Sequence, residues 1–144
     1  GRHAEADKTI ALMESSAQGL PTEREKRRIH WTRGEVALVR GDVPGAVAEL
    51  TKAVAMLPAR GLPIPPPSHH SDLLLSAAVA NIKAGRDADA ARLLERLESG
   101  QERVFRIDSY VRSLFLLAQI HERRGDAAAA LAWGNDATAR RFIP

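Results

Sequence analysis

The sequence predicts an all-α protein built of antiparallel helix pairs, with about seven helices in total. Three observations lead to this fold class. A short glycine-containing motif recurs along the chain, and apolar residues follow each copy at helical spacing. Another helical stretch precedes each copy after the first. No segment gives comparable support for a β-strand.

The recurring motif places an alanine five residues after a glycine. The pairs are Gly1 and Ala6, Gly41 and Ala46, Gly85 and Ala90, and Gly125 and Ala130. The glycines are 40, 44 and 40 residues apart. Glycine can close one helix in a left-handed conformation, and a polar residue after it can cap the next helix. We therefore expect helix-turn-helix joints, with Asp42, Asp87 and Asp126 as N-caps.

The helices on both sides of these joints follow from hydrophobic spacing. After Gly41 the apolar positions recur on one helical face, at Ala46, Val47, Leu50, Ala53, Val54 and Leu57. The helices before the joints are expected over residues 22–40, 71–84 and 108–124, the first opened by a capping box from Thr22 to Glu25. The chain therefore begins on the second helix of a pair.

These helices predict one repeat domain over residues 1–144. Its expected parts are a half repeat (1–20), a repeat (22–60), a proline-rich linker (61–68) and two further repeats (69–102 and 105–144). Proline lacks an amide proton and restricts the residue before it, so the linker is expected to be extended. A spacer between helix pairs is favoured over a ligand for proline-binding domains.

Composition excludes several classes of function. The net charge is only +3, and the chain has no cysteine, so disulfides, thiolate catalysis and cysteine-bound metals are excluded. No apolar stretch reaches the roughly 18 residues of a membrane span. His69 and His70 are adjacent and favour a solvated loop, while His121 lacks the second histidine of a zinc-protease helix. We expect a cytoplasmic protein with no enzymatic activity and no cofactor.

The positions of small and large apolar residues in these helix pairs resemble the sequence pattern of the tetratricopeptide repeat. The second unit carries the pattern best, at Gly34, Gly41, Ala46, Leu50, Ala53 and Pro58. In the fourth unit Gly134 stands where the family has a large apolar residue, and the spacing exceeds the family's roughly 34 residues. Residues 100–125 are similar to degenerate repeats appended to bacterial signalling and regulatory proteins.

The resemblance implies an α-α superhelix whose concave groove, lined by first helices, holds a protein or peptide. Placed by the family's slots, the partner-binding residues are Trp31, Glu35, Leu75, Lys83, Arg112, Phe115, Gln119 and Arg123. Aromatic residues and arginines often anchor interfaces. For Leu75, packing between repeats is the favoured interpretation. The residues in these slots argue against binding of a terminal carboxylate, as in the family's chaperone-tail binders.

The expected function is therefore a non-catalytic interaction or scaffolding module within a larger bacterial regulatory protein. A homodimer through the exposed N-terminal half repeat, near Ala6, Ile10 and Met13, is also expected, because repeats bury their cores against neighbours. The alternative is a nucleic-acid-binding module that uses the basic run Arg24, Lys26, Arg27, Arg28, Arg33 and Arg40. Interspersed glutamates favour a solvated face for that run, so nucleic acid is the less expected partner.

Overall fold

The structure is a computed structural model that describes residues 2–16, 22–57, 70–98 and 107–140. In these ranges it contains seven α-helices and no strand, which confirms the all-α prediction. Contacts between Cα atoms divide the chain into two compact units, Gly1–Pro63 and Ile64–Pro144. Each unit is described by itself. The proline-rich linker expected at residues 61–68 lies outside the described ranges.

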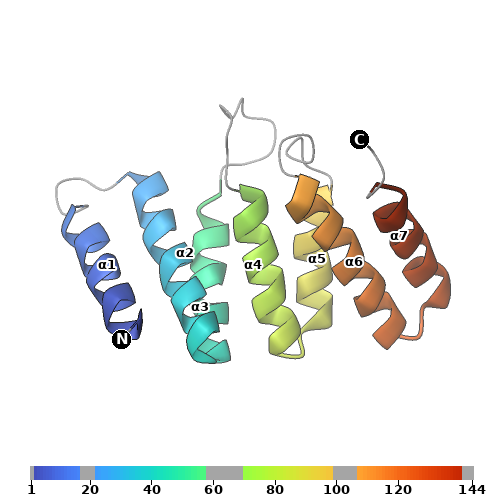
Figure 1. Ribbon diagram of the computed structural model, residues 1–144, viewed down its shortest axis with the longest axis horizontal. Coiled ribbons are helices and arrows are strands. Elements are labelled where there is room, and N and C mark those ends of the chain that lie inside the picture. The colour runs from blue at the N-terminus through green and yellow to red at the C-terminus, as the bar shows by residue number, and fades with distance from the viewer. Residues whose placement is uncertain (1, 17–21, 58–69, 99–106, 141–144) are drawn as a thin grey trace. The chain divides into compact units, whose positions relative to one another are not determined.

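Unit 1 contains three helices, each antiparallel to the next (Figure 1). They are α1 (Arg2–Ser16), α2 (Glu23–Arg40) and α3 (Val43–Ala55). The predicted capping box opens α2, because the Thr22 side chain accepts from the Glu25 amide and the Glu25 carboxylate accepts from the Thr22 amide. α2 packs against both α1 and α3.

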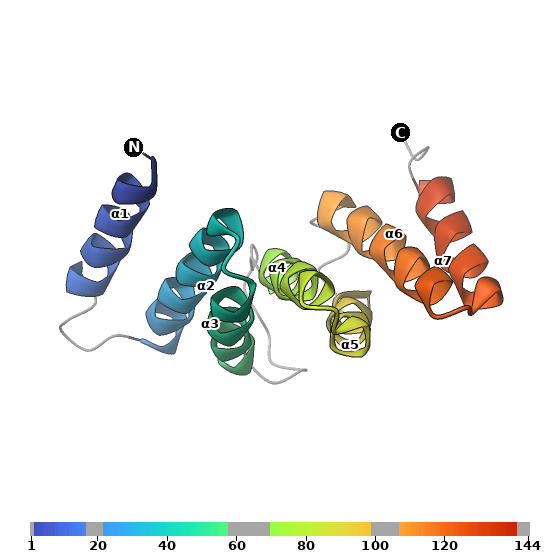
Figure 2. The same ribbon diagram turned by 90° about the horizontal axis from the view of Figure 1, so that it is seen from below.

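Unit 2 contains four helices in two antiparallel pairs (Figures 1 and 2). They are α4 (His70–Lys83), α5 (Asp87–Glu98), α6 (Ile107–Arg123) and α7 (Ala127–Arg140). α4 packs on α5, α6 packs on α7, and α6 also contacts both α4 and α5. The core between them consists of fully buried side chains, including Leu73, Leu94, Leu114, Leu117 and Ile120.

All three described joints use glycine in the way the sequence predicts. Gly41, Gly85 and Gly125 have φ values of 79°, 71° and 76°. Each donates its amide to the carbonyl three residues earlier, and the next residue donates to the carbonyl five residues before it. This pattern is a Schellman motif, which satisfies the last carbonyls of the preceding helix. Gly1 lies outside the described residues.

The cap predictions are correct at two joints and wrong at the third. The Asp42 carboxylate accepts from the Gly45 amide at 3.0 Å, and that of Asp126 accepts from the Ala129 amide at 3.1 Å. Asp87 is the first residue of α5, one position too late to cap it. The residue directly after Gly85 is Arg86, whose carbonyl accepts the first helical bond from Ala90. The capping position of α5 therefore has no side-chain acceptor.

In the α2–α3 pair, packing depends on a small residue that faces a large one. Gly34, the one buried residue of α2, lies against Leu50 of α3, which is fully buried. A Cβ atom at position 34 would lie only 2.4 Å from Leu50 Cγ. The corresponding positions in unit 2 are Ala78 with Leu94, both fully buried, and Ala118 with Gly134. At Gly134 an added Cβ would meet the Ala118 Cβ at 4.0 Å, an ordinary contact.

Candidate interaction surface

The residues predicted to bind a partner are divided between the two units. Trp31 and Glu35 lie on α2 of unit 1. The others lie on α4 and α6 of unit 2: Leu75, Lys83, Arg112, Phe115, Gln119 and Arg123. The first helix of each pair carries them, as expected from the repeat pattern. Each unit therefore carries its own set of predicted contact residues.

Of the two predicted residues on α4 in unit 2, one is buried and one is exposed. Leu75 is buried, with 7% of its surface exposed, so it packs inside the unit, in line with the interpretation favoured for it from the sequence. Lys83, the last residue of α4, is exposed. The Ser109 hydroxyl of α6 donates to Asp72 of α4 at 2.7 Å, which ties the two first helices together.

The exposed face of α6 combines an aromatic ring with a cation. Phe115 leaves 51% of its surface in solvent, and Arg112, three residues earlier, is also exposed. Gln119 follows four residues later and is half-buried. Residues three and four apart share one side of a helix, so these three form a continuous strip. In the described part of the chain, Arg112 makes no hydrogen bond or ion pair.

Arg123, in contrast, is engaged within unit 2. Its Nε donates to Asp87 Oδ2 at 2.9 Å and its Nη2 to Asp87 Oδ1 at 2.8 Å. This bidentate pair joins the end of α6 to the start of α5. The Arg123 hydrogen bonds hold the pKa of Asp87 below its ordinary value and, reciprocally, raise the pKa of Arg123. Arg123 therefore has a structural role that the sequence did not indicate.

In unit 1, the two predicted contact residues bond to each other. The Trp31 indole nitrogen donates to Glu35 Oε1 at 3.1 Å, one helical turn away. Both side chains are half-buried. An indole whose donor is already used offers mainly its ring to a ligand. The Trp31 and Glu35 side chains of unit 1 are therefore less accessible to a partner than the Phe115 strip of unit 2.

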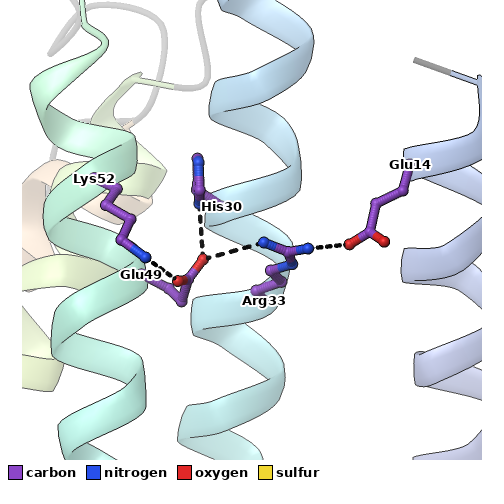
Figure 3. A network of polar contacts seen from close by, with 5 residues as sticks. All are labelled: Glu14, His30, Arg33, Glu49 and Lys52. Atoms are coloured by element: carbon purple, nitrogen blue, oxygen red, sulfur yellow. Dashed lines mark hydrogen bonds and ion pairs between the residues drawn. The ribbon is translucent and has the colours of Figure 1, made fainter. Parts of the chain in front are cut away.

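A polar network that the sequence did not predict joins all three helices of unit 1 (Figure 3). Glu49 of α3 accepts from His30 Nδ1 at 2.7 Å and from Lys52 Nζ at 2.6 Å. Arg33 of α2 lies 3.9 Å from the same carboxylate and also pairs with Glu14 of α1. Arg33 thus connects a carboxylate on α1 with one on α3.

The environment of Glu49 favours its charged form. Partial burial raises the pKa of this carboxyl, but the hydrogen bonds from His30 and Lys52 outweigh burial, so the pKa lies below its ordinary value. Only 19% of the Glu49 side chain is exposed. A carboxylate that accepts hydrogen bonds from neighbouring donors is stabilised as an anion. The network therefore stabilises the contact between α2 and α3 electrostatically.

Most of the basic run of α2 is paired inside unit 1. Arg27 is half-buried and donates to the Met56 carbonyl at 3.1 Å, at the end of α3. Burial, with a contribution from Arg24, lowers the pKa of Arg27. Lys26 pairs with Glu23, and Arg40 with Asp7. Four of the six cations of the run are therefore engaged within unit 1, while Arg24 and Arg28 are exposed.

The described residues form neither a metal-binding cluster nor a membrane-spanning helix. No group of three or more His, Asp or Glu side chains there is arranged to hold a metal ion. No helix among those residues is both long and apolar enough to cross a bilayer. No known protein family matches the chain, and no curated protein matches it either.

The sequence could indicate the Phe115 strip but not the network. Phe115 and Arg112 follow from helical spacing on one predicted helix. The bond between His30 and Glu49 joins residues on different helices, and its formation depends on how α2 and α3 are rotated against each other. The one local sign of the network is the three-residue spacing of Glu49 and Lys52.

Proposed function

We propose that the chain is a protein-interaction module of tetratricopeptide-like helix pairs. Three Schellman joints closed by glycine and the facing positions Gly34 and Leu50 support this proposal. The contacts of α6 with both α4 and α5 are those expected when one helix pair stacks on the next. The proposal assigns no catalytic step to the chain.

The observation that carries the proposal is the exposed Phe115 beside Arg112. A phenylalanine left half in water on a regular helix forgoes favourable burial, and burying it against a partner would recover this. Aromatic and arginine side chains are also the most frequent anchors of protein interfaces. The binding surface we propose is therefore the α6 strip of Arg112, Phe115 and Gln119, with the exposed Lys83 at the end of α4 as a further candidate.

The same contacts favour a protein partner over nucleic acid. Arg27, Arg33 and Arg40, three members of the basic run, bond to groups within unit 1. Binding of nucleic acid draws on many unpaired cations that release counterions. We propose the context of a larger bacterial regulatory protein in the cytoplasm, following the resemblance of residues 100–125 to repeats of that kind.

A capture experiment tests the proposal. The chain is immobilised, partners are crosslinked from lysate and identified by mass spectrometry, and the wild type is compared with an Arg112→Ala, Phe115→Ala variant. The proposal predicts that at least one protein is lost from the capture by the variant by tenfold or more, that is by about 1.4 kcal/mol or more of binding free energy.

The matched control is Leu131→Ala on α7, which removes a side chain with 66% of its surface exposed. This control should retain the captured protein. Circular dichroism checks that each variant remains helical. Equal capture by the wild type and the double variant would contradict the proposed surface, and capture of nucleic acid alone would favour the alternative function.

A further inference from the structure

The contact between α1 and α2 differs from the other helix contacts of the chain. Within the described residues, α1 contacts α2 and not α3. Its apolar residues Ala6, Ile10 and Met13 are only half-buried, and no described side chain of α1 is fully buried. In α3, by comparison, Ala46, Leu50 and Ala53 are completely buried. Hydrophobic burial therefore holds α1 weakly.

Two ion pairs add to this contact, about two helical turns apart along α1. Arg40 Nη2 lies 2.9 Å from both carboxylate oxygens of Asp7, and Arg33 pairs with Glu14. Asp7 and Glu14 are seven residues apart on α1, and so are Arg33 and Arg40 on α2. Seven residues are close to two helical turns, so both charges of each helix lie on one side. The antiparallel course of the helices then aligns both pairs (Figure 1).

One of the two arginines is held in place from the other side. Glu49 of α3 lies 3.9 Å from Arg33 Nη1, opposite the contact that Arg33 makes with Glu14 (Figure 3). Glu49 is itself fixed by His30 and Lys52. The guanidinium therefore has a partner on α3 that does not depend on α1. The α2–α3 pair presents this cation whether or not α1 is docked.

All four charged groups are accessible to solvent ions. The exposed fraction of the Asp7 side chain is 60%, and that of Arg33 is 40%. Salt screens such pairs, and each contributes little in water. A single helix the length of α1 is also only marginally stable when it is undocked. Release of α1 therefore requires neither the opening of a core nor the exposure of a buried charge.

We propose that the side of α2 carrying Arg33 and Arg40 is a docking surface for an acidic amphipathic helix of a partner protein. In the isolated chain α1 occupies this surface. A partner helix that carries two carboxylates seven residues apart beside half-buried apolar positions replaces α1. The surface lies on unit 1, so this inference is independent of the Phe115 strip on unit 2.

A peptide replacement experiment tests the proposal. In the full chain, Asp7→Lys and Glu14→Lys place cations opposite Arg33 and Arg40 and so repel the chain's own α1. A fluorescent peptide with the wild-type sequence of residues 2–16 is then added, and binding is followed by anisotropy. The peptide should bind, and its affinity should fall about fivefold between about 50 mM and about 500 mM salt.

The matched controls neutralise or reverse the charges. A peptide carrying Asp7→Asn and Glu14→Gln should bind about fivefold more weakly than the wild-type peptide. A full chain carrying Arg33→Glu and Arg40→Glu should instead prefer a peptide carrying Asp7→Lys and Glu14→Lys. No binding of the wild-type peptide, or equal binding of the amide peptide, would overturn the proposal.

Hydrogen exchange of the unmodified chain provides a second test that needs no variant to fold. Raising the salt concentration should speed exchange of the α1 amides several-fold more than exchange of the α3 amides, because salt weakens the ion pairs that hold α1. Equal protection of α1 at both salt concentrations would count against a replaceable helix.

Discussion

At the scale of single residues, glycine acts in this chain in two different ways. At Gly41, Gly85 and Gly125 it supplies the left-handed backbone that ends a helix. At Gly34 the backbone is helical, and what matters is the absence of a side chain beside Leu50. Gly134 has neither a positive φ nor a close neighbour of this kind. The same substitution should therefore have opposite effects at positions 34 and 134.

We expect Gly34→Ala to destabilise the chain and Gly134→Ala to stabilise it. Alanine is favoured over glycine in a helix by up to about 1 kcal/mol. At position 34 its Cβ would overlap the buried Leu50, and overpacking costs about 1–3 kcal/mol, so the net loss should be about 1 kcal/mol. At position 134 there is space, and the gain should be about 0.5 kcal/mol.

Urea unfolding of both variants beside the wild type measures these changes. A helical signal in circular dichroism before unfolding shows that each variant folds. A Gly34→Ala protein as stable as Gly134→Ala would mean that Leu50 yields without cost and that the close approach is not a constraint.

Glu49 should make part of the stability of unit 1 dependent on pH. Its folded-state pKa is lowered, so its contribution is complete above the unfolded pKa of about 4.3 and is lost as pH falls through the folded value. We expect Glu49→Gln to lose about 1 kcal/mol near neutral pH and progressively less as the pH falls through the folded-state pKa, because the wild-type group then becomes protonated too.

Urea midpoints from pH 7 down to about pH 2.5 would show this convergence. Glu95→Gln, which alters an exposed carboxylate on α5, serves as the control and should follow the wild type over the whole range. A Glu49→Gln difference that stays constant with pH would show that the carboxylate charge does not stabilise the fold.

At the scale of elements, the missing cap of α5 leads to a stabilising substitution. Arg86 occupies the position at which Asp42 and Asp126 cap their helices. Arg86→Ser should supply the absent acceptor and raise the unfolding free energy by about 0.5–1 kcal/mol. Asp42→Ala, which deletes an existing cap, should lower it by about 1 kcal/mol.

Thermal unfolding of the two variants tests the paired prediction. Opposite shifts of the midpoint are expected, because one substitution creates an N-cap bond and the other removes one. If Arg86→Ser left the midpoint unchanged, α5 would obtain its first-turn acceptors from elsewhere.

Local chemistry explains which elements could be predicted from sequence. The joint at Gly125 depends on a glycine φ and on a cap within four residues, so its geometry follows from neighbouring residues. The expected boundaries of α2, α4 and α6 differ from the observed ones by one residue at most at each end. The pairing of Asp87 with Arg123 joins residues 36 positions apart. Helical spacing alone does not indicate such a contact. The expectation that Asp87 caps α5 is wrong for a local reason, because Arg86 directly follows Gly85 and occupies the capping position.

At the scale of the whole molecule, each of the two units combines a packed interior with one surface that we propose binds a partner. In unit 1 that surface is the side of α2 under the weakly held α1. In unit 2 it is the strip of Arg112, Phe115 and Gln119 on α6. The sequence indicated the second surface, because it lies along one helix. It did not indicate the first, because α1 and α2 meet through charges whose pairing requires the helix register.

Site-specific photo-crosslinking tests the central claim most directly. A photoreactive phenylalanine analogue replaces Phe115 in one preparation and the similarly exposed Leu131 of α7 in another. Both are activated in lysate and analysed for covalent adducts. The account predicts a discrete protein adduct from position 115 that is absent from position 131. Identical adducts from both positions, or none from position 115, would contradict a protein-binding surface on α6.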